Sequence, residues 1–472
     1  MADLNPFKHW NSPQGYKEFL TLCLPLIAST TASSLMLFTD RLFLSNYSVN
    51  AIAASLPAGV MKVTISAVFL GIVSYTGVFV AQYTGADKPE RASGALWQGL
   101  YFSLVSGAAM AFLFFASPFI FSFGSSNQQI IDLEIQYFGP LIVCSPLDLV
   151  MVAMSVFMAA LGRTKVVMWV SLGGAILNIP LDYFFIYGLK IGSGVLLPEM
   201  GIFGASLATV VSWALTVVVF SVLIFNKKME ASHRTISNRS FDWPLMKRMF
   251  KYGWPGGLQF FMEIFTFSFF AFAVARLDDL TLACNNIVFS LEALSFFPMI
   301  GVGQTVSIMV GHSIGRSRPD EGSKAAKTGA VVSSFYVLLI VSTFLLFPNQ
   351  LLSLFLDDGL DLSSKTYILS LGTTILRFVA VYSLFDGLYL CCFGAIRGAG
   401  DVWFPLASMA AWGILGLMAP ILIFFYFNMA TIYTMWIVMV IYILGLTTTG
   451  VLRFLGKKWM KMRVIEPVLT SD

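Results

Sequence analysis

Charged side chains inside long apolar segments are the residues best placed to do chemistry, and eight of them are candidates in this sequence. They are Asp40, Lys62, Asp148, Asp182, Glu263, Glu292, Arg377 and Asp386. A charge within an apolar span costs about 2.5–3.5 kcal/mol on insertion scales, so each needs a partner or a function. We expect Asp148 and Glu292 to accept hydrogen bonds between helices. We expect Lys62 and Arg377 to reach an interface or to pair with a nearby acid.

The other four acids, Asp40, Asp182, Glu263 and Asp386, are the stronger candidates for function. A carboxyl group in a low-dielectric cavity can exchange a proton near neutral pH. With an amide or hydroxyl oxygen beside it, the same group suits a small, hard cation. Asn178 precedes Asp182 by four residues, and Tyr382 precedes Asp386 by four, so each pair shares one helix face. This pattern predicts binding of a proton or a small cation.

The elements that position these residues are twelve apolar segments, each long enough to span a bilayer, which takes about 20 residues of helix. They run near 19–44, 52–81, 94–121, 136–160, 166–188, 202–225, 249–275, 281–311, 328–347, 366–393, 402–427 and 430–455. The longest charged stretch separates the sixth segment from the seventh. We therefore predict an N-lobe at 1–225, a linker at 226–248 and a C-lobe at 249–472.

Composition places the chain in a membrane. Hydrophobic residues make up 57% of the 472 positions and charged residues 11%, whereas soluble domains carry about 25% charged residues. Lysine and arginine gather in alternate loops, which predicts that both termini are cytoplasmic. The net charge of +4 argues against a nucleic-acid partner. The five cysteines lie in apolar stretches and the three histidines lie far apart, so no zinc site or disulfide framework is expected.

The two halves of the chain repeat. Val80–Gly99 matches Val310–Gly329 at an offset of 230 residues, and Leu161–Lys165 parallels Ala399–Trp403. The second register places Asp148 opposite Asp386. Corresponding segments are separated by an even number of spans, so the halves share one orientation about an axis along the membrane normal. This architecture encloses a central cleft between two lobes, which is the usual place for a substrate.

Two prolines are predicted hinges. Pro25 and Pro255 are related by the offset of 230 and lie inside the first span of each half. A proline there removes a backbone hydrogen bond and permits the helix to bend.

Five motifs are distributed over nearly the whole chain. They are Pro25 followed by Asp40, "LNIPLDYFFIYG" with Asn178 and Asp182, "GASLAT" ending in Thr209, "WPGGLQFFME" with Glu263, and "DGLYLCCFGAIRGAGD" beginning at Asp386. Together they resemble the multidrug and toxic compound extrusion (MATE) family over nearly the whole chain. The resemblance implies an all-α polytopic fold of twelve transmembrane helices in two pseudo-twofold-related lobes of six. The chain departs from the family pattern at Arg41, where threonine is frequent, at Lys62, and in the insertion "SGVLLPE".

The resemblance also implies which residues bind the coupling ion. An N-lobe cation or proton site would comprise Asp40, Asn178, Asp182 and Thr209. A C-lobe cation site would comprise Glu263 and Asp386, as ligands for Na⁺, with Tyr382 close by.

The function that the resemblance implies is antiport. The chain would be a monomer of the bacterial inner membrane that exports amphipathic, often cationic organic compounds in exchange for H⁺ or Na⁺, without a cofactor. A flippase for lipid-linked sugars and an exporter of an anionic metabolite remain alternatives. An intramembrane enzyme is not expected, because only His312 among the histidines lies near a span and no nucleophile–base pair is visible.

Overall fold

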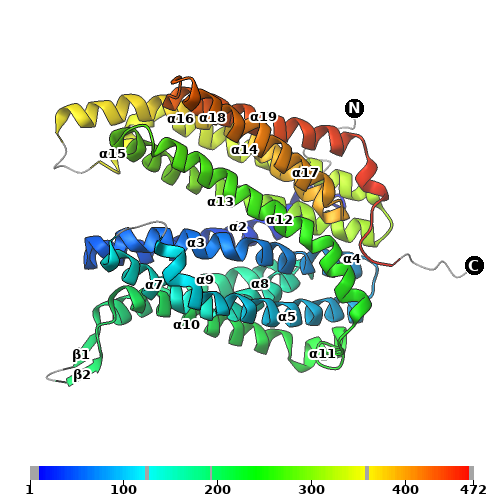
Figure 1. Ribbon diagram of the computed structural model, residues 1–472. Helices are drawn as coiled ribbons and strands as arrows, with labels where there is room; N and C mark the ends of the chain where they lie inside the picture. The colour runs from blue at the N-terminus through cyan, green and yellow to red at the C-terminus, as the bar shows by residue number, and fades with distance from the viewer. Residues whose placement is uncertain (1–9, 123–126, 192–193, 357–360, 467–472) are drawn as a thin grey trace, which may run out of the picture. The chain divides into compact units, whose positions relative to one another are not determined.

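The computed structural model describes residues 10–122, 127–191, 194–356 and 361–466 (Figure 1). The chain forms two compact units. Unit 1 contains Met1–Ile27 and Gln259–Arg463, and unit 2 contains Ala28–Leu258 and Val464–Asp472. Each unit has its own buried core and is described by itself.

Unit 2 is a bundle of helices with one small hairpin. It holds the second part of α2 (Tyr16–Tyr47), then α3 (Val49–Ser74), α4 (Thr76–Gly85), α5 (Pro89–Ala111), η1 (Phe112–Ala116), α6 (Ser117–Ser122), α7 (Gln128–Val143), α8 (Ser145–Ala160), α9 (Thr164–Tyr187), β1 (Leu189–Ile191), β2 (Gly194–Leu197), α10 (Gly201–Ile224), α11 (Lys227–His233) and the first part of α12 (Trp243–Val274).

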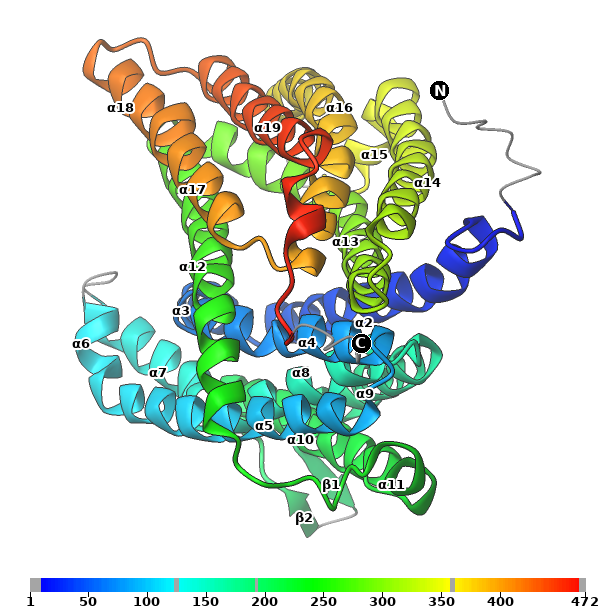
Figure 2. The same cartoon turned by 90° about the vertical axis from the view of Figure 1, so that its right-hand side faces the viewer.

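Unit 1 is helical throughout the residues described. It holds the first part of α2, the second part of α12, α13 (Asp279–Gly315), α14 (Pro319–Leu346), α15 (Pro348–Ser353), α16 (Leu362–Ala399), α17 (Trp403–Ala411), the π-helical turn η2 (Trp412–Met418), α18 (Ala419–Tyr426), α19 (Ile432–Leu455) and η3 (Lys458–Lys461). Figure 2 shows α13, α14, α16 and α19 grouped together, and α16 packs against each of the other three.

The fold class is confirmed. Among the residues described, eleven continuous helical segments are long and apolar enough to cross a membrane, and a twelfth span results if α7 and α8 are taken as one. These two helices are bent by 49° at their junction. The bend follows Pro140 in α7 and precedes Pro146 in α8, and proline removes backbone hydrogen bonds on both sides of the junction. The twelve predicted segments each coincide with one of these spans.

The internal repeat is visible in the turns between helices. Asp87 and Ser317 adopt left-handed φ values of 56° and 60°, and each is followed two residues later by a proline that opens the next helix. A proline suits that first helical position because the backbone N–H there has no partner within the helix. The same backbone therefore recurs at the offset of 230 that the sequence indicated.

The boundary between the units lies inside two helices, close to the predicted hinges. It falls after Ile27 in α2 and after Leu258 in α12, two and three residues beyond Pro25 and Pro255. Each proline removes one hydrogen bond from its helix at this place. The predicted lobe boundaries at 225 and 249 stay predictions, and the units divide at other residues.

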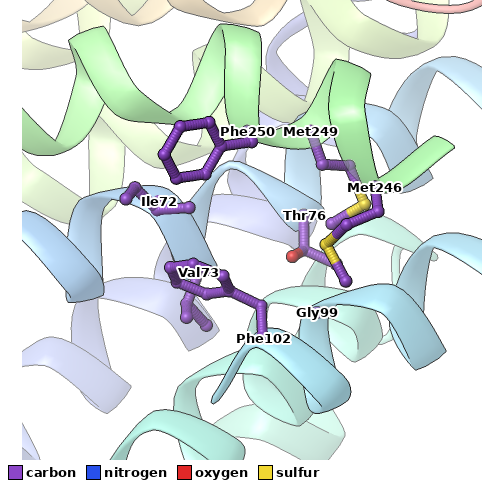
Figure 3. Close-up of a pocket in the computed structure, with 8 residues that line it drawn as sticks. All are labelled: Ile72, Val73, Thr76, Gly99, Phe102, Met246, Met249 and Phe250. Carbon is purple, nitrogen blue, oxygen red and sulfur yellow. The ribbon is translucent and has the colours of Figure 1, made fainter. Parts of the chain in front are cut away.

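The first part of α12 packs closely in unit 2. Figure 3 shows Met246, Met249 and Phe250 of α12 around a small apolar cavity. The rest of its lining comes from α3, α4 and α5, namely Ile72, Val73, Thr76, Gly99 and Phe102. Two turns beyond Phe250, a Cβ atom on Gly257 would lie 2.2 Å from the Val68 carbonyl oxygen, so only glycine permits this approach of α12 to α3.

A short hairpin follows α9, where the sequence carries its insertion. Strands β1 and β2 pair antiparallel, with Ile191 opposite Gly194. Gly188 precedes the hairpin with a φ of 75°, and α10 begins at Gly201 with a φ of 54°. The insertion therefore forms its own local structure and leaves α9 and α10 packed side by side in unit 2 (Figure 1).

The last described residues of the chain, Val464–Glu466, are anchored in unit 2. The backbone N–H of Val464 donates to Gln82 Oε1 at 3.0 Å, and the Val464 side chain is buried. The Glu466 carboxylate forms an ion pair with Arg248 and accepts a hydrogen bond from the Tyr83 hydroxyl at 2.9 Å. Partial burial raises the pKa of Glu466, but the hydrogen bonds from Arg248 and Tyr83 outweigh it and lower the pKa to about 2.

This anchor should depend on pH. A carboxyl whose pKa is lowered by its partners stabilises the docked state above its ordinary pKa and loses that contribution as pH falls toward the lowered value. We expect the hydrogen-exchange protection of the Val464 amide to decrease between about pH 4.5 and 2. At pH 7, Glu466→Gln should decrease it about fivefold, a modest effect because the pair is partly exposed. Glu321→Gln, at a surface ion pair of unit 1, is the control. Unchanged protection in Glu466→Gln would contradict the anchor.

Candidate functional site

The predicted N-lobe residues come together in unit 2. Asp40 lies on α2, Asn178 and Asp182 lie on α9, and Thr209 lies on α10, and all four are buried. The Thr209 hydroxyl donates to Asp40 Oδ2 at 3.2 Å. The carboxyl groups of Asp40 and Asp182 lie within hydrogen-bonding reach of each other. Two carboxyls this close cannot both be ionised without repulsion, so they favour a shared proton or cation.

The side-chain amide of Asn178 bridges the two carboxyl groups when its nitrogen faces them. With Nδ2 facing the acids, the amide donates to Asp40 Oδ1 at 3.1 Å and to Asp182 Oδ2 at 3.0 Å. A carboxamide can present either its nitrogen or its oxygen, and the hydrogen-bond network decides between them. Arg41 is exposed although its neighbour Asp40 is buried, so the two side chains point to different surroundings.

A second acidic group lies in unit 1. Tyr382 and Asp386 share one face of α16, and both are buried. Glu292 on α13 is the strongest charged neighbour of Asp386 and also lies next to Tyr382. The Tyr382 ring stacks on Trp436 of α19 with centroids 6.1 Å apart, which holds the tyrosine in place.

Glu263 completes this acidic group from α12. It is the next charged neighbour of Asp386 after Glu292, and it also interacts electrostatically with Tyr389 and Tyr442. Asp386 Oδ2 is buried and has no hydrogen-bond partner among the residues described. An orphaned carboxylate oxygen beside two further acids is a place for a proton or a cation.

Neither site has the ligand set of a transition metal. Within the described part of the chain, no three His, Cys, Asp or Glu side chains lie close enough to hold a metal ion together. Sodium makes a lesser demand, because carboxylate, amide and hydroxyl oxygens suit a hard cation. Carboxylates, a carboxamide and a hydroxyl are present in unit 2, and carboxylates with a phenol are present in unit 1.

Comparison with known proteins identifies the family. The MatE family model matches residues 25–184 and 255–422, which together make up more than half of the chain. The chain belongs to the MatE family. It is therefore a membrane transporter and not an enzyme.

Relatives of similar length match most of this MatE protein. A probable multidrug resistance protein NorM from Neisseria meningitidis is 26% identical over 441 residues, which cover 92% of this chain and 93% of the relative. The multidrug resistance protein NorM of Vibrio cholerae is 25% identical over 391 residues, 82% of each protein.

Solved structures share its fold. An outward-facing multidrug resistance MATE family transporter matches with a TM-score of 0.84 at 19% identity, covering 97% of this chain and 99% of the other. A MOP superfamily transporter from Pyrococcus furiosus matches with a TM-score of 0.83 at 19% identity, covering 98% and 99%.

The sequence did not single out Glu292 as part of this MatE protein's acidic group. It was expected only to accept a hydrogen bond between helices, yet it lies next to both Tyr382 and Asp386. The internal repeat is the signal that would have drawn attention to it. The offset of 230 places Glu292 opposite Lys62, another charge within a span.

The expectation that Lys62 pairs with a nearby acid is confirmed. Its ammonium group forms an ion pair with Asp148, joining α3 to α8 inside unit 2. Arg377 is exposed on α16, away from the acidic group. Neither cation therefore neutralises the carboxyl groups of the two candidate sites.

Proposed function

We propose that this MatE protein exports amphipathic, often cationic organic compounds from a bacterial cell in exchange for H⁺ or Na⁺. The observation that carries the proposal is the presence of neighbouring buried carboxyl groups in both units, Asp40 with Asp182 and Asp386 with Glu292. Such groups bind a cation reversibly, because the empty state leaves like charges in a low-dielectric interior. The multidrug resistance names of the relatives support the substrate class.

Coupling requires that ion binding favour one conformation over another. In unit 2, a proton or cation on Asp40 and Asp182 removes the repulsion between α2 and α9. Helix α2 also carries Pro25, where it can bend. Closer approach of α2 to α9 therefore favours one of the bent conformations of α2 over the others. In unit 1, a cation at Asp386 and Glu292 has the same effect on α16 and α13, and Glu263 follows Pro255 by eight residues on α12.

Two further parts of the proposal concern the setting of the protein. The alternating basic loops favour an inner-membrane protein with both termini in the cytoplasm. Two functional lobes joined by residues 226–248 would then act as one monomer, and Pro25 and Pro255 would be hinges within the first span of each half. The prolines' closeness to the boundaries of the compact units supports the hinge role.

Substrate accumulation tests this function. Cells that produce the protein should retain less of a lipophilic cationic dye than control cells, and collapsing the ion gradients should remove the difference. The control is Asp132→Asn, which replaces an exposed acid of α7 and should export like the wild type. Unchanged retention of several cationic dyes, with export of an anionic compound or a lipid-linked sugar instead, would overturn the proposed substrate.

A further inference from the structure

The internal repeat aligns the two units residue by residue through their acidic regions. Helices α3 and α4 together run from Val49 to Gly85, and α13 runs from Asp279 to Gly315, so both ends match at the offset of 230. Within this register, Lys62 of unit 2 corresponds to Glu292 of unit 1.

The second register of the repeat brings in the partner acids. Gly162 follows α8 and Gly400 follows α16, and both adopt a positive φ, of 78° and 100°. Asp148 precedes the first glycine by 14 residues and Asp386 precedes the second by 14. The pair Lys62–Asp148 in unit 2 therefore occupies the positions of Glu292 and Asp386 in unit 1.

In unit 2 the pair is complete. The Lys62 ammonium contacts Asp148, and the two side chains are only 9% and 10% exposed. The same ammonium lies 4.7 Å from the centroid of the Trp213 ring on α10, within the range of a cation–π interaction. One cation is thus bound between three helices by a carboxylate and an aromatic face.

In unit 1 the corresponding pair lacks its cation. Asp386 and Glu292 are both buried, and each is an acid. The charged neighbours that act on Asp386 are Glu292 and Glu263, and its Oδ2 atom has no hydrogen-bond partner within the described residues. Two buried acids need a counter-charge, which a proton or a metal cation can supply.

We propose that Lys62 is an internal cation that permanently fills, in unit 2, the site that the coupling cation fills reversibly in unit 1. This inference rests on the proposed function, because it assumes that a transported H⁺ or Na⁺ neutralises Asp386 and Glu292. An ammonium tethered to α3 cannot leave the protein, whereas H⁺ or Na⁺ can. The repeat therefore contains one fixed and one exchangeable cation at equivalent places, and the exchangeable one belongs to unit 1.

The first test turns the unit 2 pair into the unit 1 pair. Lys62→Glu places two acids at the positions of Lys62 and Asp148, so the purified protein should bind one more cation per chain than the wild type. Bound ²²Na⁺ and proton uptake on a pH change are measured in detergent, on samples that are monodisperse by size exclusion. This count does not depend on transport, so it remains decisive if the wild type moves no substrate.

The second test is the reverse change. Glu292→Lys should form an ion pair with Asp386, so the protein should bind one cation fewer. Gradient-driven efflux should fall to background, while exchange of labelled for unlabelled substrate without a gradient persists. The removal of both charges by Lys62→Met with Asp148→Leu should leave the cation count and the driven efflux unchanged, because a site filled permanently takes no part in coupling.

Three results would overturn the inference. One is an unchanged cation count in a folded Lys62→Glu variant, and another is wild-type driven efflux in Glu292→Lys. The third is loss of driven efflux in the folded double variant, which would make Lys62 and Asp148 part of the coupling itself. Arg453→Glu is the matched control, since Arg453 pairs with the buried Asp401 at 2.8 Å and lies 4.8 Å from the Phe404 ring. A gain of one cation there as well would show that the position of Lys62 is not special.

Discussion

Asp386→Asn is expected to reduce gradient-driven efflux to background, with exchange of substrate across the membrane partly retained. The asparagine amide has nearly the shape of the acid but cannot alternate between a charged and a neutral form. The charged neighbours that act on Asp386 are the acids Glu292 and Glu263, so removing its charge weakens the negative potential that attracts a cation in unit 1. Glu263→Gln and Glu292→Gln should each have a similar effect, because each acid contributes to the same local excess of negative charge.

The measurement compares driven efflux with counterflow, the exchange of labelled for unlabelled substrate without a gradient, in the same proteoliposomes. A residue that acts only in coupling loses the first and keeps part of the second. Asp320→Asn, which replaces an exposed acid in the first turn of α14, should behave like the wild type in both. Wild-type driven efflux in Asp386→Asn and Glu263→Gln, together with its loss in Asp40→Asn, would assign coupling to unit 2.

Asp40→Asn is expected to decrease driven efflux and counterflow together, by about tenfold or more. Asp40 is the residue on which the unit 2 network converges, since it accepts from Thr209 and faces both Asn178 and Asp182. Loss of a hydrogen bond to a charged group is worth about 1.5–3 kcal/mol, which corresponds to roughly ten- to a hundredfold in an equilibrium constant. Because Asp40 lies on α2 with Pro25, the change should alter the conformational step that both assays require.

Thr209→Val serves as the graded comparison for this second prediction. It removes one hydrogen-bond donor to Asp40 and keeps the side-chain volume, so its effect should lie between those of the wild type and Asp40→Asn. If Asp40→Asn abolishes driven efflux but leaves counterflow intact, the unit 2 network acts in coupling and not in the conformational step.

The spans and their local turns were accessible from the sequence because their causes are local. A run of about 20 apolar residues predicts a span wherever it occurs. The turns at Asp87 and Ser317 each precede a proline by two residues, and this pattern recurs at the offset of 230. Asn178 and Asp182 could be placed on one face because helical spacing is fixed.

Contacts between distant segments were not accessible in the same way. Lys62 and Asp148 are 86 residues apart. The sequence therefore indicates that Lys62 needs an acidic partner, but it does not show that this partner is Asp148 on α8. Glu292 was not counted among the candidates for cation binding. In the sequence, an acid that accepts a hydrogen bond from a neighbouring helix cannot be distinguished from one that belongs to a cation site. Pro25 and Pro255 mark the region in which α2 and α12 divide between two units, but the boundaries after Ile27 and Leu258 follow from contacts with distant segments.

A flux assay in proteoliposomes measures whether cation binding drives export. A pH gradient and a sodium gradient are imposed separately on the wild-type protein, and movement of a cationic dye against its own gradient is followed. At least one of the two gradients should drive this movement, and Asp386→Asn should abolish it. Movement of the dye only down its own gradient, whichever ion gradient is imposed, would show that neither ion drives export.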